Sequence, residues 1–303
     1  MSPPADSLGG HWSLRLPARL RALALLSRLD RPVGWRLLLL PCLMGLGLAR
    51  MGEPFRWGDL GLAGAFLVGA IAARGAGCTF NDIIDRDVDA QVARTRGRPL
   101  PAGLISLRGA WAWLAAQVLM GLLVLLALPP PAALVSLCAV PLVGAYPFMK
   151  RITWWPQAWL GLCFSWGALV AAAALGGLGL SALLLYLGCT AWVIAYDTIY
   201  ALQDVEDDAL VGVRSTARRF GARWKAGAGL FYALAAVFWL GAVTAAGAPW
   251  WVALGMALLG LAPLLWLHRL EPADALGFFR ANAPFGLALA AWLALEPALR
   301  MLL

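Results

Sequence analysis

The sequence contains little charge, little histidine and no grouped cysteines. Only 13% of its residues are Asp, Glu, Lys or Arg, whereas soluble domains carry about 25%. The two histidines, His11 and His268, are isolated, and none of the five cysteines lies at a metal-binding or redox spacing from another. These shortages exclude a soluble globular domain and argue against a zinc centre or a thiol redox centre.

Long apolar runs take the place of charge, and 62% of the residues are hydrophobic. A helix needs about 20 mainly apolar residues to cross a bilayer. Nine runs reach this length, at residues 33–51, 57–79, 107–128, 132–149, 156–176, 179–199, 226–246, 249–268 and 281–301. The sequence therefore predicts an all-α, multi-pass membrane protein with about nine transmembrane helices.

The excess of basic residues, a net charge of +8, follows the connections between these runs. Arginine and lysine gather before the first run and in every even-numbered connection, and the odd-numbered connections carry few or none. This is the positive-inside pattern, which predicts a cytoplasmic N-terminus. Topology accounts for most of the basic residues, so nucleic acid is not an expected partner.

The first 30 residues lack the apolar core of a cleavable secretory signal. An Arg-rich organelle-targeting segment is the weaker interpretation, because Asp6 lies within it. We therefore expect residues 1–30 to be a cytoplasmic segment and residues 31–303 to form one transmembrane domain. The expected location is a bacterial inner membrane, ahead of a mitochondrial one.

Two acidic clusters interrupt the apolar chain, N81-D-I-I-D-R-D-V-D89 and D197-T-I-Y-A-L-Q-D-V-E-D-D208. A carboxylate at the centre of a membrane helix costs about 2.5 to 3.5 kcal/mol, so such groups are usually functional. At about 100° per residue, each cluster places its acidic and amide side chains on one helix face. The first face carries Asn81, Asp85 and Asp89 with Asp82 beside it, and the second carries Asp197, Asp204 and Asp208. Three other carboxylates point off these faces and are expected to be solvated: Asp87, Glu206 and Asp207.

Like charges stacked on one helix face require a cation between them. Carboxylate and amide oxygens without histidine or cysteine suit Mg²⁺, which binds through one or two carboxylates together with substrate phosphates. Two such clusters imply two Mg²⁺ sites bridged by a polyphosphate-like group. Four basic side chains are candidates to bind the remaining phosphate oxygens, namely Arg94, Lys150, Arg151 and Arg214.

One arginine, Arg74, lies inside the second apolar run, seven residues before Asn81. A lone intramembrane arginine is a functional candidate, and pairing with a nearby carboxylate is its structural alternative. Arg36 occupies a similar place in the first run, where snorkelling to the interface explains it equally well. Among the sixteen tryptophans, Trp166 and Trp192 lie deep in their runs, and packing is favoured for them over a cation-stabilising cavity wall.

Four segments resemble the UbiA-type intramembrane aromatic prenyltransferases. The stretch R74-G-A-G-C-T-F-N-D-I-I-D-R-D-V-D-A-Q-V-A-R-T-R-G-R-P-L-P-A-G103 resembles the first family signature. The stretch W192-V-I-A-Y-D-T-I-Y-A-L-Q-D-V-E-D-D-A-L-V-G-V-R-S-T-A217 resembles the second. Two further stretches match, Y146-P-F-M-K-R-I-T-W-W-P-Q157 and R28-L-D-R-P-V-G-W-R-L-L-L-L-P-C42, although Arg36 stands where relatives are often wholly apolar.

The resemblance implies a helical bundle around a central cavity and Mg²⁺-dependent transfer of a polyprenyl chain from polyprenyl diphosphate to the 3-position of 4-hydroxybenzoate, as in ubiquinone synthesis. It assigns one Mg²⁺ to Asn81, Asp82, Asp85 and Asp89, and the other to Asp197, Asp204 and Asp208. Lys150 and Arg151 are expected to hold the diphosphate and to act in catalysis with Asp85, Asp204 and Arg74. Substrate binding is expected of Tyr196 and Tyr200 as well as Arg94 and Arg214.

Two alternatives stay open. The first is a prenyltransferase of the same fold with haem, chlorophyllide, homogentisate or a naphthoate as acceptor, although the stretch Y196-D-T-I-Y200 favours 4-hydroxybenzoate. The second is a Mg²⁺-dependent transporter. Four runs separate the clusters, so both lie at helix ends on one side of the membrane, which argues against the inverted repeats of many transporters. The C-terminal third contains no motif that indicates a role.

Overall fold

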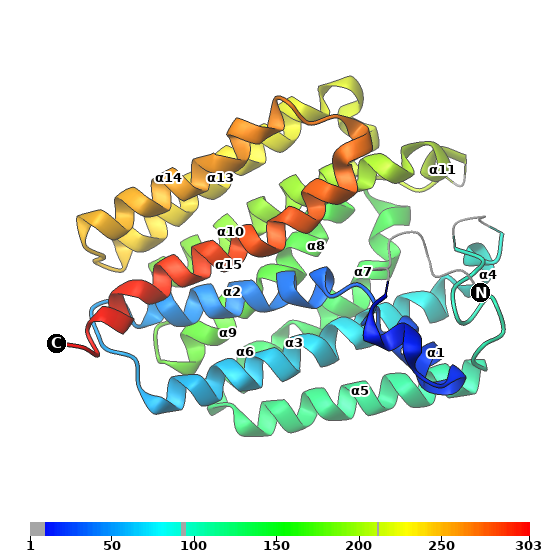
Figure 1. Ribbon diagram of the computed structural model, residues 1–303, viewed down its shortest axis with the longest axis horizontal. Coiled ribbons are helices and arrows are strands. Elements are labelled where there is room, and N and C mark those ends of the chain that lie inside the picture. Colours follow the sequence, from blue (N-terminus) through cyan, green and yellow to red (C-terminus); the bar gives the residue numbers. More distant parts are fainter. Residues whose placement is uncertain (1–9, 92–94, 211) are drawn as a thin grey trace. The chain divides into compact units, whose positions relative to one another are not determined.

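A computed structural model describes residues 10–91, 95–210 and 212–303 (Figure 1). The chain divides into two compact units. The first consists of Met1–Arg36 and Ala65–Ala127, and the second of Leu37–Gly64 and Leu128–Leu303. Two helices, α2 (Val33–Ala49) and α3 (Trp57–Ile84), begin in one unit and end in the other.

The described residues form helices, turns and loops, with no strand among them. Eight helical segments in these parts of the chain are long and apolar enough to cross a membrane, and α2 is a shorter apolar helix. Together they coincide with the nine apolar runs of the sequence, which confirms the predicted all-α, multi-pass architecture.

The first unit packs two short N-terminal elements against two long helices. Its elements are η1 (Trp12–Arg15), α1 (Ala18–Leu26), the start of α2, most of α3, α4 (Arg86–Asp89) and α5 (Leu107–Ala127). Leu26, Leu100 and Ala110 form its buried core. Helices α3 and α5 lie against each other, because Thr79 of α3 donates a hydrogen bond to Gln117 of α5 at 3.2 Å. Helix α1 lies within the N-terminal segment, for which the sequence predicted no helix.

Helix α1 ends in a left-handed turn at Arg28, whose φ is 56°. The backbone N–H of Arg28 donates to Leu25 and that of Leu29 donates to Ala24, the two hydrogen bonds of a Schellman motif. Glycine normally occupies this position, because a side chain in the left-handed region costs about 1 kcal/mol. An arginine here therefore indicates that its guanidinium is needed at this place.

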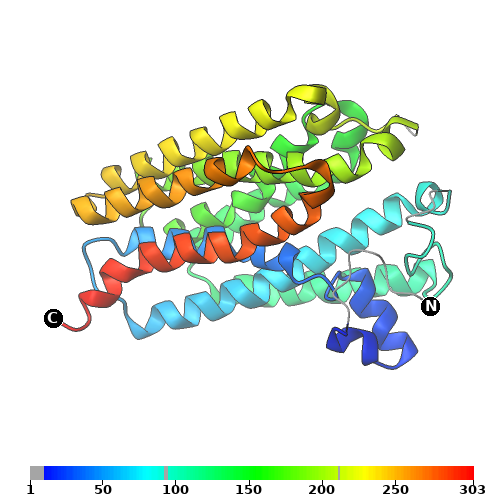
Figure 2. The same cartoon turned by 45° about the horizontal axis from the view of Figure 1, so that its top comes forward.

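The second unit is built around α10 (Leu180–Tyr200), most of whose side chains are buried. Helix α10 packs along α13 (Trp224–Ala245), α8 (Pro156–Ser165) and α15 (Ala275–Leu299). Helices α13 and α14 (Trp250–Leu267) form a hairpin, the yellow and orange pair in Figure 2. The remaining elements are α6 (Pro130–Cys138), α7 (Val140–Ile152), α9 (Gly167–Ala174), η2 (Ala201–Asp204), α11 (Val205–Leu210), α12 (Thr216–Phe220), η3 (Gly221–Arg223) and η4 (Pro272–Asp274).

Two runs predicted as single helices are broken. The run at 132–149 consists of α6 and α7, which meet at Ala139 because Pro141 has no N–H and its ring crowds the preceding turn. The run at 156–176 consists of α8 and α9, with the break at Trp166. The N–H of Ala139 bonds to Ser136 instead of Val135, and the Trp166 indole donates to the carbonyl of Val135 at 2.8 Å. Trp166 thus has the packing role predicted for it, because its indole N–H bonds to the carbonyl oxygen that the break leaves without its helical partner.

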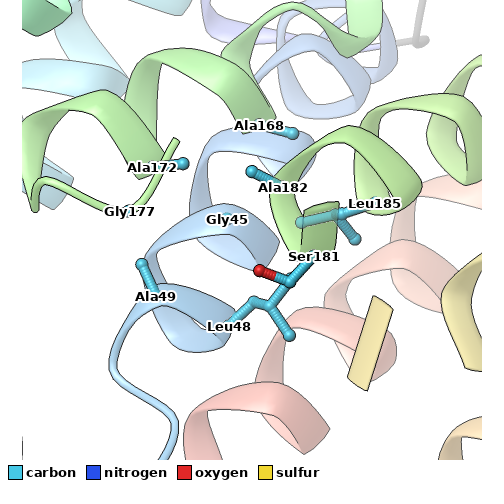
Figure 3. Close-up of a pocket in the computed structure, with 9 residues that line it drawn as sticks. All are labelled: Gly45, Leu48, Ala49, Ala168, Ala172, Gly177, Ser181, Ala182 and Leu185. Atoms are coloured by element: carbon cyan, nitrogen blue, oxygen red, sulfur yellow. The ribbon is translucent and has the colours of Figure 1, made fainter. Parts of the chain in front are cut away.

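Small residues let helices of the second unit approach closely. An added Cβ at Gly45 would lie 2.8 Å from the backbone oxygen of Ala168, and one at Gly47 would lie 2.9 Å from the backbone of Leu293. Figure 3 shows the apolar recess beside Gly45, lined by Leu48, Ala49, Ala168, Ala172, Gly177, Ser181, Ala182 and Leu185. No charged side chain lines this recess, so it is unsuited to a diphosphate.

Candidate active site

The first acidic cluster lies where α3 ends and the short helix α4 begins. Asp85 caps α4, yet the hydrogen bonds from Asp85 N–H to Asn81 (2.9 Å) and from Asp89 N–H to Asp85 (2.8 Å) keep the four-residue spacing through the break. Asp82, Asp85 and Asp89 are buried, whereas Asp87 is exposed and pairs with Arg86. This division between buried and exposed carboxylates agrees with the division predicted from the sequence.

Two arginines hold two of the buried carboxylates of this cluster, Asp82 and Asp89. Nη2 of Arg28 donates to both oxygens of Asp82, at 2.7 and 2.9 Å. Nη1 of Arg98 bridges Asp82 and Asp89, at 3.2 and 2.6 Å. Sequence reasoning missed both roles, although each arginine lies in a stretch that resembles the prenyltransferases. The left-handed turn at Arg28, invisible in the sequence, is what aims its side chain at Asp82.

The carboxyl of Asp89 lies outside the membrane-spanning segments, and burial raises its pKa above the usual range. The positive charge of Arg98 works in the opposite direction, and the neighbouring Asp82 and Asp85 raise the pKa further. The net effect is a raised pKa of Asp89, so this carboxyl holds a proton more readily than an exposed aspartate. A divalent cation would compensate the repulsion among the three acids.

Arg74 lies on α3, two turns before Asn81, and is half-buried. Its guanidinium packs against Gly34 in the first turn of α2. The structure thus brings the predicted intramembrane arginine to the start of the stretch R28–C42 rather than leaving it isolated. Arg36, by contrast, is exposed, and its guanidinium lies 5.5 Å from the centre of the Trp35 ring.

The second acidic cluster lies at the C-terminal end of α10 and the two elements that follow. Asp197, Asp204 and Asp208 are half-buried, while Glu206 and Asp207 are exposed, again as predicted. The assumption of one continuous helix is wrong, because residues Ala201–Asp204 form the 3-10 helix η2. A 3-10 turn advances about 120° per residue, so Asp204 is rotated by roughly 80° from the face that a continuous α-helix would give it.

Basic residues of the second unit gather beside this cluster. Lys150 is half-buried and Arg151 exposed, both in the last turn of α7. The backbone N–H of Arg214 donates to the carbonyl of Lys150 at 2.9 Å, and its guanidinium donates to the carbonyl of Ile152 at 2.7 Å. Three of the four predicted phosphate-binding residues therefore lie on adjoining segments. The fourth, Arg94, lies outside the described residues.

A buried polar chain ties these segments to α10. Gln157 accepts a hydrogen bond from the backbone N–H of Thr216 at 2.9 Å, and the hydroxyls of Thr216 and Thr198 lie 2.6 Å apart. The single hydroxyl proton of Thr198 goes to the carbonyl of Ile194, so Thr216 is the donor to Thr198. Thr198 follows Asp197 directly. The chain therefore fixes the basic segments relative to the helix that carries the second acidic cluster.

We expect Thr216→Val to lower the free energy of unfolding by about 1 to 2 kcal/mol, because it leaves the buried Thr198 oxygen without its donor. Thr216→Ser keeps the hydroxyl and is the matched control, with a smaller loss. Thermal unfolding of the purified protein in detergent measures both. Equal stability of the valine and serine variants would contradict the assigned hydrogen bond.

The two predicted substrate-binding tyrosines lie in an aromatic cluster of α10 and α15. Tyr196 is buried with its ring edge-on to Trp192 (5.3 Å between centres) and Phe279 (5.7 Å), and Tyr200 lies 4.3 Å from Phe279. Trp192 is fully buried and donates to Asn282 at 2.8 Å. Packing is thus the role of Trp192, and Asn282 gives the C-terminal third a part in shaping this region that the sequence did not reveal.

Comparisons with known proteins agree with these features. A family model described as the UbiA prenyltransferase family matches residues 38–285. The mitochondrial 4-hydroxybenzoate polyprenyltransferase of Homo sapiens is 41% identical over 282 residues, which cover 89% of this chain and 74% of that protein. The protein of the same name from Drosophila melanogaster is 42% identical over 274 residues, covering 88% of this chain and 69% of the relative.

Solved structures show the same architecture. The apo structure of a UbiA homolog from Aeropyrum pernix has a TM-score of 0.69 and 28% identity, covering 88% of this chain and 98% of that one. The structure of a UbiA homolog from Archaeoglobus fulgidus bound to GPP and Mg²⁺ has a TM-score of 0.64, covering 89% and 99%. At 21% identity, the second likeness shows the fold alone.

Proposed function

Because this chain belongs to the UbiA prenyltransferase family, we propose that it transfers a polyprenyl chain from polyprenyl diphosphate to 4-hydroxybenzoate and releases diphosphate, in ubiquinone biosynthesis. One observation carries this proposal. Relatives named 4-hydroxybenzoate polyprenyltransferase are about 40% identical to it over most of its length. Both acidic clusters lie within the matched region, so the parts that the chemistry needs are present.

The donor atoms of the two clusters fit Mg²⁺. Within the described parts of the chain, no three side chains of His, Cys, Asp or Glu form a ready-made metal cage. Mg²⁺ does not require one, because it binds through one or two carboxylates, several waters and substrate phosphates. Asn81, Asp82, Asp85 and Asp89 would hold one ion, and Asp197, Asp204 and Asp208 the other. A UbiA homolog of the same fold was solved with GPP and Mg²⁺ bound.

The basic residues of the site bind and orient the diphosphate. Lys150, Arg151 and Arg214 lie on adjoining segments beside the second cluster, where their positive charges attract the phosphate oxygens. Bound Mg²⁺ neutralises charge on the diphosphate and so makes it a better leaving group. Arg74 places a further positive charge inside the span. Tyr200, which is half-buried, would contact the substrate, and the buried Tyr196 would support it from within the aromatic cluster.

The reaction itself replaces a carbon–oxygen bond by a carbon–carbon bond. The allylic C–O bond breaks with its electron pair going to the diphosphate, and apolar side chains around the site keep water from the allylic cation. The ring carbon ortho to the phenol oxygen of 4-hydroxybenzoate attacks this cation. The proton on that carbon then passes to diphosphate or to an aspartate carboxylate, which restores the aromatic ring.

The membrane topology follows from the distribution of apolar and basic residues along the chain. The chain is a multi-pass membrane protein, and the distribution of arginine and lysine supports a cytoplasmic N-terminus with both clusters on the cytoplasmic side. Several relatives are named mitochondrial, so a mitochondrial inner membrane stands beside the bacterial one expected from the sequence. In either membrane the polyprenyl tail would extend from the site into lipid.

Purified protein in detergent tests the proposal. Given 4-hydroxybenzoate, a polyprenyl diphosphate and Mg²⁺, it should form prenylated product, and EDTA should abolish product formation until Mg²⁺ is restored. Homogentisate and a naphthoate in place of 4-hydroxybenzoate should give little product. Product only from another acceptor would overturn the proposed acceptor, and metal flux in proteoliposomes without any transfer would overturn the enzyme assignment.

A further inference from the structure

Gly34 has no side chain, and the guanidinium of Arg74 occupies the space where one would lie. Gly34 is buried in the first turn of α2, and Arg74 lies on α3. A Cβ added at Gly34 would lie 2.5 Å from Nε of Arg74 and 3.1 Å from both Cζ and Nη2. The first distance is too short for non-bonded atoms and the other two are tight, so any residue other than glycine at position 34 must displace the guanidinium.

The backbone beside Arg74 is held in place, so only its side chain can yield. The next residue, Gly75, lies so close to α5 that its own Cβ would be 3.0 Å from Nε2 of Gln117. Gln117 in turn donates to Ser27 at 2.6 Å and accepts from Thr79 at 3.2 Å. Trp113 donates to the same Ser27 oxygen at 2.8 Å. This buried hydrogen-bond network anchors α3 in the turn that follows Arg74.

We propose that Gly34 is a positioning residue that sets the place of the Arg74 guanidinium in the site. The inference rests on the proposed function, in which Arg74 supplies a positive charge to the reacting substrates. A side chain at position 34 shifts that charge while α3 itself stays fixed. A misplacement of about 1 Å in a catalytic site can cost about a hundredfold in rate.

Because Gly34 lies in a helix, the effect of Gly34→Ala on activity can be separated from its effect on stability. Alanine is a better helix former than glycine, which offsets part of the cost of displacing the flexible Arg74 side chain, so Gly34→Ala is expected to change the Tm only slightly. Gly64→Ala is the matched control, because Gly64 lies on α3, is exposed, and an added Cβ there meets no atom within 4 Å. A loss of activity in the first variant but not in the second therefore reports on Arg74 and not on glycine content.

The test is a double-mutant cycle on prenyl transfer, with wild type, Gly34→Ala, Arg74→Ala and the double variant, and with the Tm of each. We expect Gly34→Ala to lower kcat/KM about tenfold to a hundredfold and to raise the KM of the same substrate as Arg74→Ala does. The double variant should be no less active than Arg74→Ala, because the displaced group is already gone. If Arg74→Ala shows no turnover, the cycle is read from the shift in Tm that each substrate causes.

Each outcome of this test either supports or overturns the positioning role of Gly34. Wild-type kinetics in Gly34→Ala, or losses that add in the double variant, overturn the positioning role while the enzyme assignment stands. Equal losses in Gly34→Ala and Gly64→Ala overturn it as well. Absence of transfer by the wild-type protein overturns the proposed function and this inference with it.

Discussion

Replacing Asp85 or Asp204 with asparagine should lower kcat for prenyl transfer by at least about a thousandfold. Each substitution removes one negative charge from a cluster proposed to hold Mg²⁺ against the diphosphate. Stabilisation of a leaving group by a bound metal is worth several kcal/mol, and about 4 kcal/mol corresponds to a factor of a thousand. Prenyl transfer by purified variants, at the Mg²⁺ concentration that saturates the wild type, is the measurement.

The chain offers a matched control in each cluster. Asp87 and Asp207 are exposed and point away from the buried carboxylates, so Asp87→Asn and Asp207→Asn should retain nearly full activity. If raising the Mg²⁺ concentration restores Asp85→Asn or Asp204→Asn, the carboxylate contributes to metal affinity. Wild-type activity in either of these two variants at ordinary Mg²⁺ would contradict the metal-binding role of that cluster.

Arg50→Met should lower the free energy of unfolding by about 3 to 5 kcal/mol, the usual result of removing one partner of a buried ion pair. Arg50 follows α2 and donates to both oxygens of Asp59, at 2.8 and 2.7 Å, with only 10% and 5% of the two side chains exposed. Substitution by methionine leaves the charge of Asp59 buried without this partner. Denaturant or thermal unfolding in detergent measures the loss.

Arg56→Met is the control for that measurement. Arg56 pairs with Glu53 at 3.2 Å, but both side chains are more than half exposed, and exposed pairs contribute between about 0 and 1 kcal/mol. The side chain of Arg50 donates to Asp59 and Glu53, neither of which is assigned to catalysis, so the folded fraction of Arg50→Met should turn over normally. Similar losses of stability in the two variants would contradict the assignment of the buried pair.

Hydropathy alone predicted the membrane-spanning helices, because the bilayer imposes a length and a composition on them that any sequence must display. The pattern also separated the exposed carboxylates from the less exposed ones correctly in both clusters, since a period of 3.6 residues determines which side chains share a face. Local breaks were harder to predict. The 3-10 turn at Ala201–Asp204 has no proline or glycine to announce it, and it changes the direction in which Asp204 points.

Helical periodicity does not predict contacts between segments that are distant in the sequence. Arg28 contacts Asp82 only because α1 ends in a left-handed turn. An arginine at this position does not predict a left-handed conformation, which glycine normally adopts. Asn282 and Glu296 carried no motif, yet Asn282 accepts hydrogen bonds from Trp192 and Tyr232, and Glu296 accepts one from Gly52. Such partners are fixed by tertiary packing, which one sequence does not display.

The discontinuity of the second unit has a consequence for how the chain is made. Residues 37–64 belong to it, but the first unit's residues 65–127 are synthesised before the remainder of the second. The backbone N–H of Phe55 bonds to the carbonyl of Pro297, and Gly47 meets Leu293. Contacts so far apart in the chain form late, so α2 can pack on α9 first but completes its packing only after α15 has been made. Insertion of α15 is therefore the step of biogenesis at which the second unit closes.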